Sequence, residues 1–172
     1  MALDGVKYLQ TIVDNVPGGV FCCRYDEPLT LLHVTDGFLR MLGYAREELE
    51  REKRNSFRAL FFPPDVEPTL SEVRMQLALG DTKEIEYRLV RRDGCVIWVL
   101  DKGQLMRDEA GGEIFYCILV DITRQKQAQE ELNQTAQRMR ILMEQTDDVI
   151  FEWDVSKWEL TVSSMWTRKF GP

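Results

Sequence analysis

The sequence contains one histidine and four cysteines, which restricts metal and redox chemistry. His33 has no ligand partner at a metal-site spacing, and no two cysteines form a C-x-x-C pair. Cys22 and Cys23 are adjacent, so on a strand they would point to opposite faces and could not serve one site. The other two, Cys95 and Cys117, stand alone. We therefore expect no metal site and four reduced cysteines in a cytoplasmic protein.

Long apolar runs and an excess of positive charge are also missing. No apolar stretch reaches the roughly 18 residues of a membrane span, and the first residues lack the charged and apolar regions of a secretory signal. The net charge is −7 over 172 residues, with a pI near 4.9. Nucleic acids and anionic membranes select basic surfaces. We expect neither nucleic acid nor direct membrane contact as a partner of this segment.

Catalytic motifs are absent from the sequence as well. It has no G-x-S-x-G, no P-loop and no Cys–His pair, and the paired carboxylates Glu130 and Glu131 fall on an expected solvated helix. Hydrophobic residues make up 44% of the chain and charged residues 30%, the balance of an ordinary folded protein. We therefore expect a folded protein with no active site in these residues.

Apolar spacing and turn residues define the elements of the first half of the chain. Helices are expected where apolar residues recur at helical spacing and end at glycine or proline. Asp36 is the expected N-cap of a short helix that Gly43 closes. The expected elements are a helix over 6–16, hairpin strands over 20–25 and 29–34, the short helix over 38–42, a helical piece from 46, and a longer helix over 66–80.

The second half reads as three antiparallel strands. Ile85, Tyr87 and Leu89 alternate with charged residues, which is typical of a half-buried strand. A tight Asp-Gly turn at 93–94 predicts a hairpin, and a second turn at 109–112 returns the chain. The whole order predicts an α+β fold with one five-stranded antiparallel sheet and its helices on one face, flanked by an N-terminal helix and a C-terminal connecting helix.

Asp121-Ile122-Thr123 joins an apolar, β-branched run to a polar segment of helical composition, with no Gly or Pro between them. Asp and Thr both offer a side-chain oxygen to the free N–H groups of a helix start. The carboxylate also favours the positive end of the helix dipole. We expect the last strand to feed the helix with little slack, so that a shift of the strand moves the helix. The alternative is a plain N-cap.

An internal repeat is visible near the end of the chain. Residues 20–43 align with residues 149–171 with one gap, so that Val20 falls on Val149 and Gly43 on Gly171. A segment with helical apolar spacing precedes each copy. Two such patterns predict the opening of a second copy of the domain.

These elements and motifs together resemble a PAS domain, the sensor module of bacterial signalling proteins. The resemblance is carried by GVFCCRYD (19–26), DGFLRMLGY (36–44), RRDGCVIWV (91–99) and DIT (121–123), in that order and spacing. It implies four segments: an N-terminal helix over 1–17, a PAS sensor domain over 18–123, a connecting signalling helix over 124–145, and the truncated start of a second PAS domain over 146–172.

A PAS sheet curves around a pocket that holds haem, flavin, a carboxylate or nothing. Residues 51–64 lack the cysteine of flavin photoreceptors, and residues 65–79 lack a haem-binding histidine. Haem and flavin are therefore not expected, which leaves either an unknown small-molecule ligand or a filled core. The candidate pocket residues are Phe21, Phe38, Leu42, Arg58, Phe61, Val73, Leu77, Ile85, Tyr87, Trp98 and Cys117.

The resemblance implies a sensory role with two kinds of output. One is a downstream GGDEF diguanylate cyclase domain, and the other is a histidine kinase. A ligand-free dimerisation or interaction module is the alternative. Spacing by sevens along the connecting helix predicts a weak coiled-coil seam and a homodimer. The candidate seam residues are Ala128, Leu132, Thr135, Met139 and Leu142.

Overall fold

The computed structural model describes residue 13, residues 18–145 and residues 151–162. The helix expected over 1–17 lies outside the described residues, apart from Val13, which is helical. Contacts divide the chain into two units, Met1–Arg124 and Gln125–Pro172. Each unit is described by itself.

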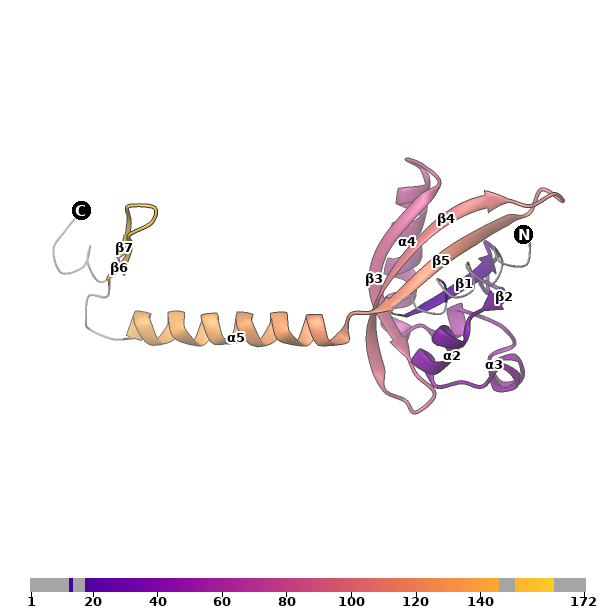
Figure 1. Ribbon diagram of the computed structural model, residues 1–172, viewed down its shortest axis with the longest axis horizontal. Helices are drawn as coiled ribbons and strands as arrows, with labels where there is room; N and C mark the ends of the chain where they lie inside the picture. The colour runs from indigo at the N-terminus through magenta and orange to yellow at the C-terminus, as the bar shows by residue number, and fades with distance from the viewer. Residues whose placement is uncertain (1–12, 14–17, 146–150, 163–172) are drawn as a thin grey trace, which may run out of the picture. The chain divides into compact units, whose positions relative to one another are not determined.

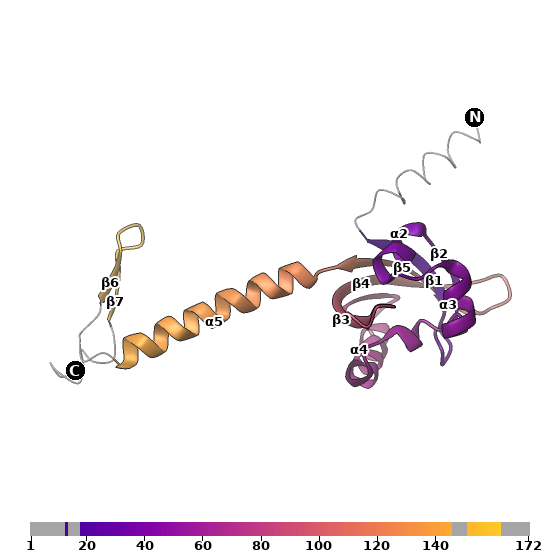
Figure 2. The ribbon, with the colours of Figure 1, turned by 90° about the horizontal axis from the view of Figure 1, so that it is seen from below.

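The first unit is an α+β fold built on one antiparallel sheet with the strand order β2-β1-β5-β4-β3 (Figure 1). Helices α2, α3 and α4 gather on one side of this sheet (Figure 2), as the sequence predicted. The elements are β1 (Gly19–Arg24), β2 (Leu31–Val34), α2 (Asp36–Leu42), α3 (Arg46–Lys53), the 3-10 turns η1 (Arg58–Leu60) and η2 (Pro63–Asp65), α4 (Val66–Leu77), β3 (Thr82–Val90), β4 (Val96–Arg107) and β5 (Glu113–Asp121).

Strict alternation along the strands creates the core between sheet and helices. Along β3, Ile85, Tyr87 and Leu89 are buried while Glu84 and Glu86 are exposed, the period of two that a strand imposes. Helices α2 and α3 contribute side chains with no exposed surface, namely Phe38, Leu42 and Leu49. Buried partners on the other elements include Phe21, Phe38, Leu42, Leu49, Leu60, Ile97, Val99, Phe115 and Leu119.

Helix α2 is capped by Thr35, and the expectation that Asp36 is the cap is wrong. The Thr35 Oγ1 atom accepts hydrogen bonds from the N–H of Phe38 at 3.4 Å and of Val20 at 3.0 Å. One hydroxyl therefore serves both the helix start and strand β1, which a cap at Asp36 would not do. Asp36 is the first helical residue, where its charge favours the helix dipole. Gly43 closes the helix with a φ of 77°, as predicted.

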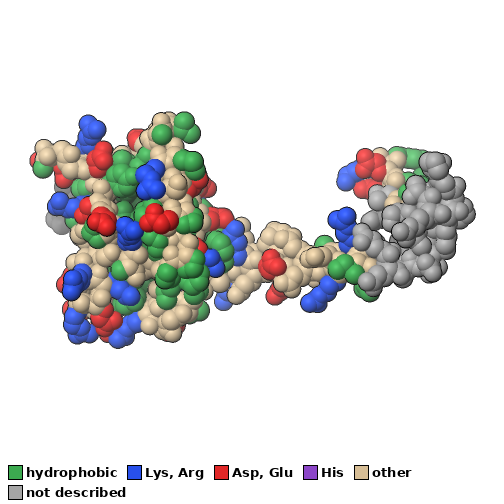
Figure 3. All heavy atoms as spheres, turned by 180° about the vertical axis from the view of Figure 1, so that it is seen from behind, with side chains coloured by type: hydrophobic (Ala, Val, Ile, Leu, Met, Phe, Trp, Pro, Cys, Tyr) green, Lys and Arg blue, Asp and Glu red, His purple; other side chains and the backbone are tan. Residues whose placement is uncertain are grey.

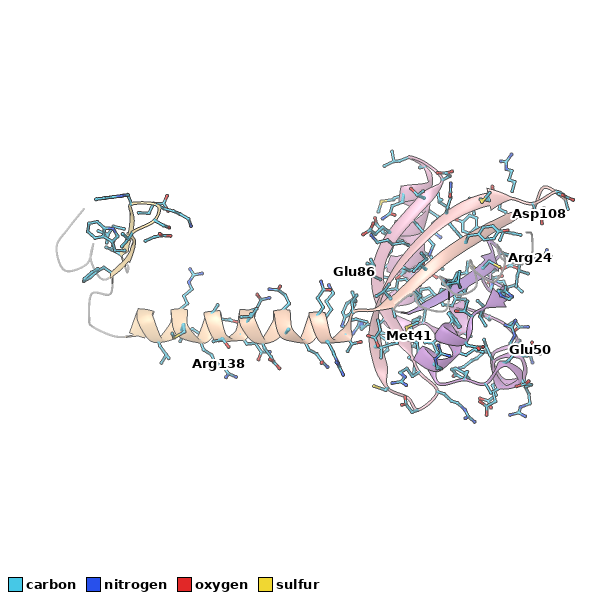
Figure 4. The ribbon with its side chains drawn as sticks, viewed as in Figure 1. Arg24, Met41, Glu50, Glu86, Asp108 and Arg138 are labelled. Atoms are coloured by element: carbon cyan, nitrogen blue, oxygen red, sulfur yellow. The ribbon has the colours of Figure 1, made fainter. Side chains whose placement is uncertain are left out.

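Both predicted turns between the last three strands are present. Gly94 has a φ of 82°, and Asp93 accepts a hydrogen bond from the N–H of Cys95 at 2.9 Å. At the second turn Asp108, labelled in Figure 4, accepts from the N–H groups of Ala110 and Gly112. These side chains use backbone donors that the strand ladder leaves free, so each hairpin has a defined register.

The second unit contains most of α5 (Thr123–Gln145) and a hairpin of β6 (Phe151–Asp154) and β7 (Glu159–Val162). Asp154 organises the hairpin turn by accepting from the N–H groups of Ser156 and Lys157. Among the described residues, no helix is both long enough and apolar enough to cross a membrane.

In the view of Figure 3, acidic and basic side chains alternate over the surface of the first unit.

Candidate functional site

A pocket lies between the inner face of the sheet and helix α4, inside the first unit. The empty space between its walls is about 360 Å³, a volume that includes the opening to solvent. As the side chains stand, about one water molecule fits inside it. The lining residues are Phe21, Cys23, Tyr25, Leu29, Phe57, Phe61, Thr69, Leu70, Val73, Lys83, Tyr87, Asp101 and Phe115.

Aromatic rings form most of the apolar wall. Phe61 stacks on Tyr87 with ring centroids 4.6 Å apart, and Phe21 packs on Phe57 at 4.4 Å. Leu29 completes the wall from the β1–β2 loop with a φ of 53°, a left-handed conformation that branched side chains rarely adopt. The two aromatic pairs hold their ring faces in fixed orientations, which suits a small ring-shaped ligand.

The polar end of the pocket is a buried cluster of Lys83, Asp101 and Tyr87. The Lys83 Nζ atom forms an ion pair with Asp101 Oδ2, and the Tyr87 hydroxyl donates to the same oxygen at 2.7 Å. The side chains of Lys83 and Asp101 are only 7% and 1% exposed. The Lys83 ammonium also lies 5.1 Å from the ring centroid of Phe115. Two opposite charges are thus held inside an otherwise apolar interior.

Gly103 makes the room for this cluster. It lies opposite Lys83 on β3 and opposite Cys117 on β5. A Cβ atom at Gly103 would come within 2.6 Å of the Cys117 Sγ atom and 3.0 Å of the Lys83 Cε atom. The missing side chain therefore lets the long Lys83 side chain turn along the inner face of the sheet towards Asp101.

Burial and the ion pair act in opposite directions on the Lys83 pKa. Burial alone lowers it, because it disfavours the charged amine, but the attraction of the Asp101 carboxylate and the hydrogen bond to it outweigh burial, so the net pKa is raised. Burial, together with Asp101, raises the Tyr87 pKa well above its ordinary range. Lys83 is therefore charged and Tyr87 neutral at physiological pH.

Two buried cysteines flank the ion pair. Burial raises the pKa of the Cys23 thiol to about 12. For Cys117, burial and then the Asp101 carboxylate raise the thiol pKa further above its usual value. Both residues are protonated at neutral pH, which makes them poor nucleophiles and poor metal ligands. Cys23 acts in this site as a small apolar side chain, whereas a hydrogen bond between the Cys117 thiol and Asp101 adds to the rise in the Cys117 pKa.

One atom of the cluster is not satisfied. Among the residues that the structure describes, none donates a hydrogen bond to Asp101 Oδ1, although this atom is buried. A buried carboxylate oxygen without a donor is unfavourable, so such atoms in proteins are usually met by water or by a ligand.

The candidate pocket residues occupy three different environments. Phe21, Phe61, Val73 and Tyr87 line the pocket. Other candidates belong to the core away from the pocket lining, and they are Phe38, Leu42, Leu77, Ile85 and Cys117. Arg58 lies at the surface, where it forms ion pairs with Glu67 at 3.2 Å and Glu27 at 3.9 Å.

Trp98 lies on the opposite face of the sheet from the pocket, so its expected position in the pocket wall is wrong. Its neighbours Ile97 and Val99 are the buried residues of β4, and Trp98 itself is half-buried. The Arg88 guanidinium lies 5.3 Å from the centroid of its indole ring. The phase of the strand is set by the buried Ile97, Val99 and Asp101, and this phase turns Trp98 outward.

A second ion pair forms on this outer side of β3. Arg88 donates to both carboxylate oxygens of Asp65, at 2.9 Å and 2.6 Å, and its backbone N–H donates to Asp65 at 3.0 Å. The hydrogen bond from the Arg88 side chain holds the pKa of Asp65 below its usual value. Asp65 directly precedes α4, so the pair fastens the start of that helix to β3.

Lys83 and Asp101 were missed in the sequence, although the alternation contains the signal for them. Lys83 has the same phase as Ile85 and Tyr87, and Asp101 the same phase as Ile97 and Val99. Two opposite charges in the core-facing phase of adjacent strands predict an ion pair. Neither residue is singled out by the sequence analysis, because charged side chains are rarely fully buried.

The junction into α5 is held by β4. Asp121 Oδ1 accepts from the N–H of Thr123 at 2.9 Å, the expected cap contact. The Thr123 hydroxyl, however, accepts from the N–H of Trp98 at 3.0 Å. The N–H of Ile122 donates to the Trp98 carbonyl at 2.9 Å, and the Ile122 side chain is buried. Thr123 therefore ties the helix start to the sheet, whereas its hydroxyl was expected to cap the helix.

The candidate seam on α5 is exposed. Leu132, Met139 and Leu142 have exposed fractions of 66%, 55% and 61%, and Ala128 and Thr135 are exposed as well.

No group of three or more His, Cys, Asp or Glu residues that could hold a metal ion occurs in the described part of the chain.

Comparison with known proteins identifies the fold. The model of the PAS fold family matches residues 31–119. A probable diguanylate cyclase of Escherichia coli (strain K12), DgcE, is 28% identical over 127 residues, which cover 72% of this chain and 11% of that protein. The chain thus spans about a tenth of the length of this relative.

Solved structures give the same result. A sensory box histidine kinase/response regulator from Burkholderia thailandensis is similar with a TM-score of 0.60 at 22% identity, over 77% of this chain and 97% of that chain. The PAS domain of an HTR-like protein from Haloarcula marismortui has a TM-score of 0.53 at 25% identity, over 70% and 94%. With its five-stranded sheet, its helices on one face and the family match over residues 31–119, the chain belongs to the PAS fold family and carries a PAS sensor domain.

Proposed function

We propose that residues 18–123 sense a ligand or partner and pass the change through α5 to an output domain of the same chain. The output best supported is a GGDEF diguanylate cyclase, because the relative DgcE is a probable diguanylate cyclase. A histidine kinase output is the second candidate, since a structural neighbour is a sensory box histidine kinase. In either case the segment itself has a regulatory role and no catalytic one.

The lateral register of the sheet carries this proposal. Tyr87, whose hydroxyl meets the buried ion pair, lies opposite Val99 on β4, and Val99 lies opposite Asp121 on β5. Adjacent strands are about 4.8 Å apart, so two strand spacings, about 10 Å, separate the polar end of the pocket from the junction. A displacement of β3 at Tyr87 would therefore reach the residues that begin α5.

Thr123 transmits such a displacement to the helix. Its hydroxyl bonds the N–H of Trp98, and Trp98 lies opposite Arg88 on β3. Because Ile122 also donates to Trp98, two hydrogen bonds join the junction at Ile122 and Thr123 to strand β4. Strand β4 and the start of α5 would therefore move together.

We further propose that α5 is a dimer seam and that the domain limits are those inferred from the sequence. The exposed residues Leu132, Met139 and Leu142 recur at heptad positions and would be covered by a second copy of α5. The β6–β7 hairpin fits the opening of a second PAS domain over 146–172. Four free cysteines fit a reducing, cytoplasmic setting.

The test is a change of helical phase in a full-length protein in which the output domain follows α5. One residue inserted at 133–134 rotates everything downstream by about 100°, and seven inserted residues nearly restore the original face. We expect the single insertion to lock or abolish regulation and the seven-residue insertion to preserve it. Nucleotide product formed by the output domain is the readout, with and without signal. Equal tolerance of both insertions would show that no signal passes through this helix.

A further inference from the structure

The polar end of the pocket has the properties of a recognition site for a hydrogen-bond donor. Asp101 Oδ2 is already occupied by Lys83 and Tyr87, whereas the buried Oδ1 accepts no hydrogen bond from any described residue. Asp101 itself lines the pocket. A hydroxyl or N–H group brought into the pocket would satisfy this atom, and a carboxylate acceptor makes the hydrogen bond stronger than a neutral one.

The charge of the site selects a neutral molecule. Lys83 and Asp101 cancel each other within an interior whose remaining walls are apolar. A cationic or anionic ligand would bring an uncompensated charge into this low-dielectric space, which is strongly unfavourable. The ligand therefore carries its polarity in one donor group and has an apolar body.

The walls select a small aromatic body. Phe21, Phe57, Phe61 and Phe115 present ring faces and edges to the space, and rings bind one another in offset or edge-to-face arrangements. A cavity of about 150 Å³ is sufficient for benzene, whereas the space here, as the side chains stand, admits about one water molecule. A single ring therefore requires Leu70 and Val73 on α4 to move away from the sheet.

We propose that the pocket binds a neutral, single-ring aromatic molecule whose hydroxyl or N–H group donates to Asp101 Oδ1. This inference rests on the proposed sensory function, because the ligand is the signal that the domain detects. It also gives the Tyr87–Asp101 contact a role: a ligand on Oδ1 shares the carboxylate whose other oxygen accepts a hydrogen bond from the Tyr87 hydroxyl of β3.

Phenol and toluene are a matched pair of probes for this proposal, because they differ in a hydroxyl against a methyl group. Titrations of the 172-residue chain, followed by NMR of its aromatic and methyl groups, give both dissociation constants. We expect phenol to bind at least about tenfold more tightly than toluene, with the largest shifts at residues of the pocket. Equal affinities, or tighter binding of toluene, would overturn the proposal, as would the absence of binding by both probes in the millimolar range.

Two variants assign the preference to Asp101. The double variant Lys83→Met/Asp101→Leu removes both charges together, a replacement that proteins commonly tolerate. It should still bind toluene while its preference for phenol falls below about twofold. Tyr87→Phe retains the ion pair and should retain the preference. A double variant that still prefers phenol tenfold contradicts the proposal, and if it fails to fold, the comparison of probes on the native chain and on Tyr87→Phe decides.

Failure here is separable from failure of the proposed function. The helix insertions measure transmission through α5 and involve no ligand of known identity. If phenol shows no preference but the insertions act differently from each other, the ligand class is wrong and the sensory role stands. If phenol binds as expected but both insertions are tolerated equally, the ligand site stands and transmission through α5 does not.

Discussion

Strand β3 carries two ion pairs of opposite character, one on each face. Lys83 binds Asp101 on the inner face, where the two side chains are 7% and 1% exposed. Arg88 binds Asp65 on the outer face, where the exposed fractions are 33% and 15%. Lys83 and Arg88 are close neighbours along this one strand. The alternation of the strand alone decides which pair is removed from water.

The comparison shows that burial, and the geometry that burial permits, determines what an ion pair contributes. On the outside, water screens the charges and the pair mainly fixes geometry, here the start of α4 against β3. On the inside, each charge depends on the other, because neither can be solvated. Removing one partner is therefore a much larger change inside than outside.

The largest effect is expected for Asp101→Ala, which leaves the Lys83 ammonium buried without its counter-ion. We expect the free energy of unfolding to fall by about 3–5 kcal/mol, a large share of the stability of an ordinary domain. Urea denaturation followed by tryptophan fluorescence measures it. The matched control is Lys83→Met/Asp101→Leu, which removes both charges and should be much closer to the native chain. A double variant as unstable as Asp101→Ala would mean that the pair itself stabilises the fold.

A smaller effect is expected for Trp98→Ala on the outer face. The ring is half-buried and packs near Arg88, so its truncation should reduce the free energy of unfolding by about 1–2 kcal/mol. The reference is Leu119→Ala on the inner face, where a fully buried side chain should give about 2–5 kcal/mol. A loss above about 3 kcal/mol for Trp98→Ala would show that another part of the protein, or a second copy, covers this face.

The smallest effect is expected for Asp65→Asn. We expect a loss of up to about 1 kcal/mol at neutral pH. Arg88 lowers the pKa of Asp65 in the folded state, so the contribution is fully present above the unfolded pKa of about 3.9 and is lost as the pH falls through the lower folded pKa. The stability difference between the native chain and Asp65→Asn should therefore be constant above about pH 5 and shrink in more acidic solution. A difference that does not change with pH contradicts this role for the carboxylate.

The sequence predicts the fold well, because alternation and turn residues are local signals. The strands around 93–94 and 109–112 follow directly from glycine turns, and the buried phase of β3 follows from Ile85, Tyr87 and Leu89. The helix start at Thr35 is less predictable, since its hydroxyl is chosen by a contact with Val20 on another strand.

The candidate site is only partly predictable, because burial of charge depends on contacts far apart in the sequence. Trp98 is a candidate pocket residue in the sequence, whereas the phase of β4, with Asp101 buried, turns it to the other face of the sheet. Lys83 can point inward only because Gly103 leaves space opposite it. Neither fact is local, so a reading of one strand at a time assigns the largest apolar residue to the interior and the charged residues to the surface.

Gly103 has a consequence for how this pocket can change over evolutionary time. Any side chain at Gly103 meets both Cys117 and Lys83. A substitution at Gly103 therefore affects three positions, on three neighbouring strands, together. A side chain at Gly103 would require the Cys117 thiol and the flexible end of Lys83 to move, and a displaced Lys83 would loosen its ion pair with Asp101. The chemistry that the domain can detect is thus altered through the smallest residue in it, at a position that need not touch a ligand.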